Sequence, residues 1–301
     1  MIGLAKIESW VYQFSKEIIM VNRREFIKST AGAFCALNVS SINHNVFVSS
    51  KKKLDRVGLQ LYTIRTEMKK DFEGSLAKVA EIGYKEVEFA GYFGRKPGGI
   101  AKLLKQLDLD AVAAHISFKD INDQFEKTVE AAKAIGLRYV IIPSWFDRQK
   151  YTTKDSLKGF AEILNQAGEK CKSAGIQFGY HNHNHEFKDV DGVIPYDVFV
   201  KETDPELVVM EMDLFWIIKG GQNPLDYFKR YPGRFQLCHV KDLDKDQKMV
   251  DVGKGNIDFG EIFTKSKQAG LKHYFVEHDN PDDPFASIIL SFKHLQGLEF
   301  G

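Results

Sequence analysis

Ala80-Glu81-Ile82-Gly83-Tyr84 closes an amphipathic stretch of the chain and leads into a short apolar run. Related segments recur as Ala134-Ile135-Gly136-Leu137, Ser173-Ala174-Gly175-Ile176 and Gln268-Ala269-Gly270-Leu271. Glycine ends a helix readily because, without a β-carbon, it adopts the left-handed conformation found at helix C-termini. Each repeat therefore predicts a helix that stops at a glycine and passes into a strand.

Around these repeats, short apolar runs alternate with segments whose apolar residues recur at three- and four-residue steps, which is typical of helices. The candidate strands are Val57–Ile64, Glu86–Ala90, Ala111–Ile116, Tyr139–Pro143, Ile176–His181, Leu207–Asp213, Phe235–Val240 and His273–Glu277. Alternating strands and helices predict parallel strands joined by right-handed crossovers. Eight such units in about 250 residues favour the α/β class and a closed (β/α)8 TIM barrel.

An open, doubly wound sheet is the alternative arrangement of the same pattern. Its dinucleotide-binding forms carry a glycine-rich fingerprint after the first strand. Here Val57-Gly58-Leu59-Gln60-Leu61 runs through without one. The barrel is therefore the preferred prediction.

Composition narrows the functional classes. The 301 residues are 44% hydrophobic and 28% charged, which fits a globular protein. The 42 basic and 41 acidic residues leave a net charge of +1, so we expect no nucleic-acid partner. Three widely spaced cysteines, Cys35, Cys171 and Cys238, give no disulfide framework. A homo-oligomer is compatible with the sequence.

The N-terminal region resembles an export signal. Arg23-Arg24 stands ahead of a weakly apolar, small-residue stretch from Ser29 to Asn38, the pattern of a twin-arginine (Tat) signal. We therefore predict that residues 1–50 are an extension with a Tat-type signal peptide and linker, and that residues 51–301 form the barrel. The predicted location is the periplasm, or the cytoplasm if the signal is not used. The apolar stretch is too short and too polar to span a membrane.

Ionisable residues gather where the predicted strands end, which is where barrel active sites lie. Imidazole and carboxylate groups that converge from different strands favour a borderline-to-hard divalent metal ion and leave positions open for substrate oxygens. The candidate ligands are His181, Asp213, His239 and Glu277. Period-two alternation puts His181 and His183 on one side of their strand, so one of them is expected to bind metal and the other substrate. A solvated loop is the alternative for the histidine run.

Five motifs in order resemble the sugar phosphate isomerase/epimerase family of xylose isomerase-like TIM barrels, which includes inosose dehydratase, hydroxypyruvate isomerase and tagatose 3-epimerase. They are 58-GLQLYTIR-65, 179-GYHNH-183, 212-MDLFW-216, 238-CHVKD-242 and 252-VGKGNIDF-259. The resemblance covers about residues 55 to 300. It implies a Glu–Asp–His–Glu metal set on strands five to eight, with Asp213, His239 and Glu277 at the last three positions. His181 stands where the family has the first glutamate, with His183 as the alternative.

The resemblance implies one divalent metal ion, with Mn²⁺ favoured and Zn²⁺, Co²⁺ or Mg²⁺ also compatible, and a small carbohydrate as substrate. The first functional hypothesis is a sugar isomerase or epimerase that moves a proton next to a carbonyl through an enediolate. The alternative is a lyase or dehydratase that acts on a keto-sugar or keto-glycoside, in the manner of inosose dehydratase. A sugar-binding protein without catalysis is the third.

Individual roles follow from these hypotheses. Glu277 is the first choice for a base beside the metal, with His183 or His181 as a second base. Lys241 is expected to hold a substrate oxygen or to form a salt bridge at the rim. Sugar hydroxyls and rings are the expected partners of Glu88, His115 and Trp216, and Trp145 is a further ring-stacking or packing candidate.

Overall fold

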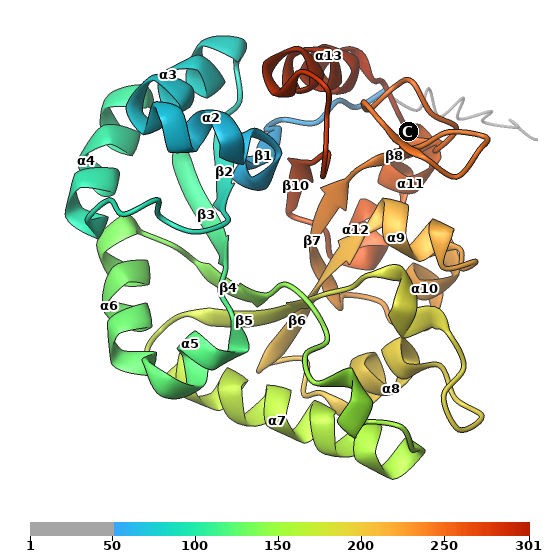
Figure 1. Cartoon of the computed structure of the whole chain (residues 1–301). Coiled ribbons are helices and arrows are strands. Elements are labelled where there is room, and N and C mark those ends of the chain that lie inside the picture. The colour runs from blue at the N-terminus through green and yellow to red at the C-terminus, as the bar shows by residue number, and fades with distance from the viewer. Residues whose placement is uncertain (1–50) are drawn as a thin grey trace, which may run out of the picture. The chain divides into compact units, whose positions relative to one another are not determined.

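A computed structural model of the protein describes residues 51–301. Eight parallel strands close into a barrel with the helices outside it, which confirms the predicted (β/α)8 fold (Figure 1). Around the barrel the order is β1-β10-β7-β6-β5-β4-β3-β2. Their bounds are β1 (Gly58–Gln60), β2 (Glu86–Phe89), β3 (Asp110–His115), β4 (Tyr139–Ile142), β5 (Gln177–His181), β6 (Val208–Asp213), β7 (Phe235–Val240) and β10 (His273–Val276).

The connections between these strands carry helices and one small hairpin. The helices are η1 (Leu61–Ile64), α2 (Arg65–Lys70), α3 (Phe72–Ile82), α4 (Pro97–Leu107), α5 (Phe118–Asp123), α6 (Phe125–Ile135), η2 (Arg148–Lys150), α7 (Lys154–Ser173), η3 (Asn184–Phe187), α8 (Pro195–Glu202), α9 (Leu214–Lys219), α10 (Pro224–Arg230), α11 (Phe259–Thr264), α12 (Ser266–Ala269) and α13 (Pro284–Gly297). The hairpin pairs β8 (Asp242–Leu243) with β9 (Met249–Val250). At the four repeats, Gly83, Gly136, Gly175 and Gly270 all have φ between 77° and 117°, so these glycines do end helices as predicted.

The first predicted strand was too long. The chain leaves the sheet at Gln60 and turns into a short 3-10 helix, because the Gln60 side chain accepts a hydrogen bond from the backbone N–H of Tyr62. Leu61 and Ile64 remain fully buried, so the apolar run that suggested a strand reflects burial. The other seven predicted strands agree with the structure to within one residue at each end.

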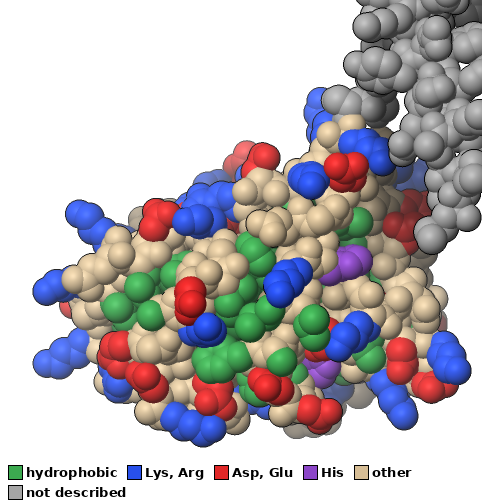
Figure 2. Space-filling view, turned by 90° about the horizontal axis from the view of Figure 1, so that it is seen from above, with side chains coloured by type: hydrophobic (Ala, Val, Ile, Leu, Met, Phe, Trp, Pro, Cys, Tyr) green, Lys and Arg blue, Asp and Glu red, His purple; other side chains and the backbone are tan. Residues whose placement is uncertain are grey.

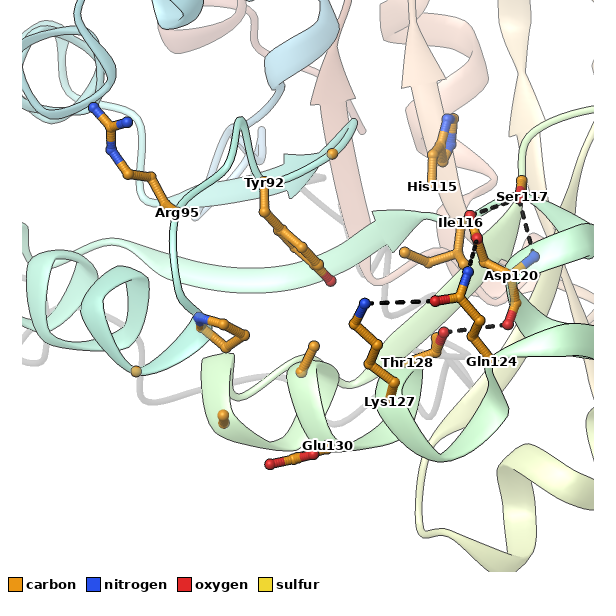
Figure 3. Close-up of a pocket in the computed structure, with 15 residues that line it drawn as sticks. Tyr92, Arg95, His115, Ile116, Ser117, Asp120, Gln124, Lys127, Thr128 and Glu130 are labelled. Atoms are coloured by element: carbon orange, nitrogen blue, oxygen red, sulfur yellow. Dashed lines mark hydrogen bonds between the residues drawn. The ribbon is translucent and has the colours of Figure 1, made fainter.

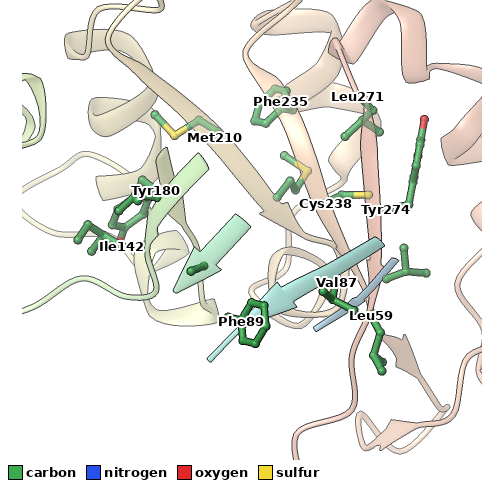
Figure 4. Close-up of a cluster of buried hydrophobic side chains, with 14 of the residues drawn as sticks. Leu59, Val87, Phe89, Ile142, Tyr180, Met210, Phe235, Cys238, Leu271 and Tyr274 are labelled. Atoms are coloured by element: carbon green, nitrogen blue, oxygen red, sulfur yellow. The ribbon is translucent and has the colours of Figure 1, made fainter. Parts of the chain in front are cut away.

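The barrel interior is layered. An apolar cluster of Val112, Ala113, Tyr139, Ile141, Val209, Leu237 and Phe275 fills its middle. Alternate side chains of a strand point the same way, so the residues two positions further along β6, β7 and β10 stack above this cluster. Those residues are Glu211, His239 and Glu277. The outward-facing side chains form the larger core between strands and helices (Figure 4).

Near the ends of the described segment, the backbones of Lys52 and Phe300 exchange two hydrogen bonds. On the face seen in Figure 2, acidic and basic side chains are interspersed. Within residues 51–301, no helix is both long and apolar enough to cross a membrane. The predicted export signal and linker, residues 1–50, lie outside the described residues.

Candidate metal centre

Five ionisable side chains from four neighbouring strands converge at the C-terminal end of the barrel. The sheet register places His181 beside Glu211 and Asp213 beside His239. Glu277 follows the last residue of β10, the neighbour of β7. All five are at most 5% exposed. The alternation of the strands thus brings together every residue that the sequence put forward as a metal ligand, and adds Glu211.

Asp213, His239 and Glu277 offer one ligand atom each, and these atoms lie within 4.8 Å of one another. His239 Nδ1 is 2.6 Å from Glu277 Oε2 and 3.9 Å from Asp213 Oδ2. His181 Nε2 approaches the same Asp213 oxygen at 3.6 Å. His239 Nδ1 therefore faces both carboxylates, and His181 Nε2 faces that of Asp213.

The inward-facing atoms of the three residues contact one another and one lysine. The Lys241 ammonium lies 3.0 Å from Asp213 Oδ2 and 2.8 Å from Glu277 Oε2, and His239 Nδ1 is 2.6 Å from the same Glu277 oxygen. A buried cluster of several ionisable groups at the mouth of a barrel is typical of a functional site. Nitrogen and carboxylate oxygens of this kind fit a divalent metal ion such as Zn²⁺ or Mn²⁺.

A second layer of carboxylates lies behind the histidines. Glu211 Oε2 is 3.2 Å from His181 Nδ1, 3.2 Å from His239 Nε2 and 2.8 Å from His115 Nε2. Glu88 Oε2 is 2.6 Å from His239 Nε2 and accepts a hydrogen bond from Gln60. Metal-binding histidines usually donate their second ring N–H to a carboxylate, which fixes the tautomer and orientation of the ring. Glu211 and Glu88 are placed to do this for His181 and His239.

A second possible ligand group consists of His115, His181, Glu211 and His239, and it shares His239 with the first group. In the first group His239 Nδ1 faces Glu277, whereas in the second His239 Nε2 faces Glu211. Glu211 was not among the ligands predicted from the sequence, although it stands two residues before Asp213 and so faces the same way. Glu88, expected to contact substrate, is fully buried behind His239. The substrate contact of Glu88 stays a prediction.

Lys241 adds a positive charge to the site. Its ammonium lies 3.0 Å from Asp213 Oδ2, 2.8 Å from Glu277 Oε2 and 2.8 Å from Asp279 Oδ1. Burial alone would lower the pKa of Lys241, but the three carboxylates raise it well above its usual value, so this amine is charged. Burial would likewise raise the pKa of Glu277, yet Lys241 and His239 hold it well below its usual value. For Asp213, burial prevails and raises the pKa to about 6.

His183 lies just beyond β5, with its ring 5.1 Å from that of His181 and 5.5 Å from that of Trp216. Burial, followed by the nearby Lys241 charge, lowers the pKa of His183 to about 3, so its imidazole is neutral. The neutral imidazole of His183 thus lies next to the candidate ligands. By contrast, Trp145 is 6% exposed and packs against Phe199 in the core.

Glu186 holds the loop that carries His183. Its carboxyl accepts hydrogen bonds from the Tyr180 hydroxyl at 2.7 Å and from the His183 backbone N–H at 2.9 Å. Burial raises the pKa of Glu186 from 4.5 to about 8, so the folded protein keeps this proton at neutral pH. A raised carboxyl pKa contributes stability that is complete below about pH 4.5 and is lost as the pH rises through about 8.

Glu186→Gln, which mimics the protonated side chain, is therefore expected to be more stable than the unchanged protein at about pH 9, by roughly a few kcal/mol. At about pH 4 the two proteins should be alike. Denaturant unfolding at both pH values measures this difference. The same pH dependence in both proteins would mean that Glu186 is not the ionising group.

Comparisons with known proteins agree with the barrel fold. The model of the xylose isomerase-like TIM barrel family matches residues 76–295. Inosose dehydratase of Mesomycoplasma hyopneumoniae is 25% identical over 225 residues, 67% of this chain and 74% of that protein. Inosose dehydratase of Lacticaseibacillus casei is 23% identical over 265 residues, 74% of this chain and 88% of that protein.

Solved structures extend the same likeness. A sugar phosphate isomerase/epimerase from Parabacteroides distasonis is 28% identical, with a TM-score of 0.70, over 83% of this chain and 96% of that one. The IOLI protein, solved with a zinc atom, is 17% identical, with a TM-score of 0.65, over 80% of this chain and 96% of that one. At that identity, the second likeness concerns the fold.

Proposed function

Because this chain belongs to the xylose isomerase-like TIM barrel family, we propose that it is a metal-dependent sugar isomerase or epimerase that moves a proton beside a carbonyl group. The observation that carries the proposal is the convergence of buried ligand atoms from Asp213, His239 and Glu277 at the C-terminal mouth of the barrel. His181 is proposed as the fourth ligand, since its Nε2 faces the same Asp213 oxygen.

Protons beside a carbonyl are too weakly acidic for a free imidazole or carboxylate to remove. A bound divalent ion would supply Lewis-acid stabilisation of the negative charge that develops on the substrate oxygens, with Mn²⁺ or Zn²⁺ suited to this mixed donor set. The Lys241 ammonium adds a buried donor for the same charge.

Two groups are proposed to transfer the proton. His183 carries a neutral imidazole, and Glu277 carries a carboxylate. They come from β5 and from the end of β10, which β6 and β7 separate, so they can approach a substrate carbon from different sides. As negative charge develops on the substrate, the imidazolium form of His183 becomes more stable, which offsets its low pKa. Removal by one group and return by the other gives isomerisation or epimerisation.

Elimination is the second candidate reaction. It is favoured by the inosose dehydratases among the relatives and by the histidine on β5, where the epimerases that this chain resembles have glutamate. Both reactions begin with the same proton removal and form the same enediolate. They differ in whether the proton returns or a neighbouring carbon–oxygen bond breaks.

The test is incubation of the metal-loaded protein in deuterium oxide with a panel of keto-sugars and their glycosides. Isomerisation or epimerisation adds deuterium at the exchanged carbon, whereas elimination releases water or an alcohol and leaves a lighter product. A chelator should stop either reaction. Binding of these sugars without hydrogen exchange, by fully metal-loaded protein, would refute the enzymatic proposal and support a sugar-binding protein.

Export to the periplasm remains a proposal that rests on Arg23-Arg24. Replacing both arginines by lysine is expected to block export and leave full-length protein in the cytoplasm, because Tat signals depend on the arginine pair. Cell fractionation with an antibody against the barrel measures the distribution. Undiminished periplasmic protein in the double variant would rule out a Tat signal.

A further inference from the structure

A cavity of about 680 Å³ lies beside the candidate centre, between the β2–α4 loop and helix α6 (Figure 3). Its lining includes His115 and Ile116 at the end of β3. His115 belongs to the centre itself, since its ring stacks on that of His239 at 5.2 Å and its Nε2 contacts Glu211. The cavity therefore reaches the candidate centre from the side of its second layer, at His115.

The cavity has room for a ring of its own. Pockets that bury small organic ligands have volumes of about 300–1,000 Å³. Small residues keep the cavity open, among them Gly98, Ala131 and Ala134. A β-carbon built on Gly98 would meet no atom within 4 Å. The proposed chemistry at the metal centre does not use this space.

The walls combine an aromatic ring with hydrogen-bonding groups. Tyr92 and Lys127 point toward one another across the cavity (Figure 3). The Tyr92 ring packs edge-on against Phe89 at 5.7 Å, and burial raises the pKa of its phenol to about 12, so it stays neutral. Lys127 donates a hydrogen bond to Gln124 Oε1 at 3.5 Å and forms no ion pair within residues 51–301. An aromatic ring beside an ammonium that has no carboxylate partner suits a ring that carries oxygen substituents.

We propose that this cavity is a subsite for a second ring attached to the sugar that reacts at the metal centre. The substrate would then be a glycoside or disaccharide with a carbonyl on the reacting ring, in place of a free monosaccharide. This inference rests on the proposed function and specifies its substrate class. The second ring would lie against Tyr92, with Lys127 and Gln124 near its oxygen atoms.

Gly98 and Gly99 provide a matched pair of variants. Both glycines are exposed, lie in the first turn of α4 and have no atom within 4 Å of a built β-carbon, but Gly98 lines the cavity. Gly98→Phe should fill the cavity, whereas Gly99→Phe should place the same ring outside it. Phenylalanine favours a helix more than glycine does, so neither variant is expected to lose the fold.

The experiment compares kcat/KM, measured by solvent hydrogen exchange, for the methyl glycoside of a keto-hexose and for the same sugar carrying a glucosyl or a phenyl ring. The unchanged protein should prefer a two-ring substrate by at least about tenfold, because the second ring adds buried area as well as an aromatic contact. Gly98→Phe should abolish this preference and Gly99→Phe should retain it. A phenyl preference without a glucosyl one would identify an aromatic aglycone, and the reverse a second sugar.

Tyr92→Leu provides a second variant that keeps the cavity apolar, and it should lower the same preference by about two- to tenfold. Exchange of neither substrate by the unchanged protein would overturn the proposed function. Equal kcat/KM for one-ring and two-ring substrates in the unchanged protein and in Gly98→Phe would overturn the subsite alone.

Discussion

Asp213→Asn is expected to remove the bound metal ion and to lower turnover by about a thousandfold or more. Asparagine keeps the shape of the side chain. In the unchanged protein, Asp213 Oδ1 accepts a hydrogen bond of 2.9 Å from the backbone N–H of Trp216, which caps α9, and the asparagine oxygen can accept the same bond. What is lost is the anionic Oδ2 that faces His181 and His239. Lewis-acid stabilisation is worth several kcal/mol, and each 1.4 kcal/mol changes a rate about tenfold. Elemental analysis and turnover assays measure both effects on one sample.

Two further variants locate the ion. Asp279→Asn removes a partly exposed carboxylate that contacts Lys241 and lies outside both ligand groups, so this variant should keep its metal. Glu211→Gln should weaken metal binding by only about ten- to a hundredfold, as expected for a residue behind the ligands. Loss of metal in Glu211→Gln, with full occupancy in Asp213→Asn, would place the ion among His115, His181, Glu211 and His239 instead.

His183→Ala is expected to keep the metal and to lower turnover by about a hundred- to ten-thousandfold, the usual contribution of a positioned general base. The defect should appear as slower exchange of the substrate proton with solvent. The imidazole is proposed for this role because it is neutral and its ring lies 5.1 Å from that of His181.

His181→Ala should fail differently. One proposed ligand nitrogen is removed, and the second layer loses the His181 contact with Glu211, so metal affinity should fall. Loss of metal in His183→Ala, with metal retained and turnover lost in His181→Ala, would mean that His183 is the ligand, two residues after the proposed position. Near-normal metal content and turnover in both variants would reduce the histidine run to a loop without a role in the reaction.

The sequence by itself determined the barrel and the end of it that carries the chemistry. Helices that end at Gly83, Gly136, Gly175 and Gly270 have a local cause, the left-handed backbone that glycine adopts most easily, and this cause is visible in the residues themselves. The ends of the strands could be predicted from the sequence as well, because the apolar runs reflect burial in a parallel sheet. The candidate ligands could be named because they stand where those strands end.

Only the tertiary structure decided what lies behind the ligands and beside them. Glu211 and Asp213 lie on the same face of β6, two residues or about 6.6 Å apart along the strand. Over that distance the position changes from behind the histidines, for Glu211, to the proposed metal position, for Asp213. That depth depends on how neighbouring strands are staggered, which no local pattern encodes. The cavity joins Gly98 and Tyr92 to Lys127, residues from separate units of the barrel. Its shape arises from the packing of α4 against α6, so it could be recognised only once the barrel had closed.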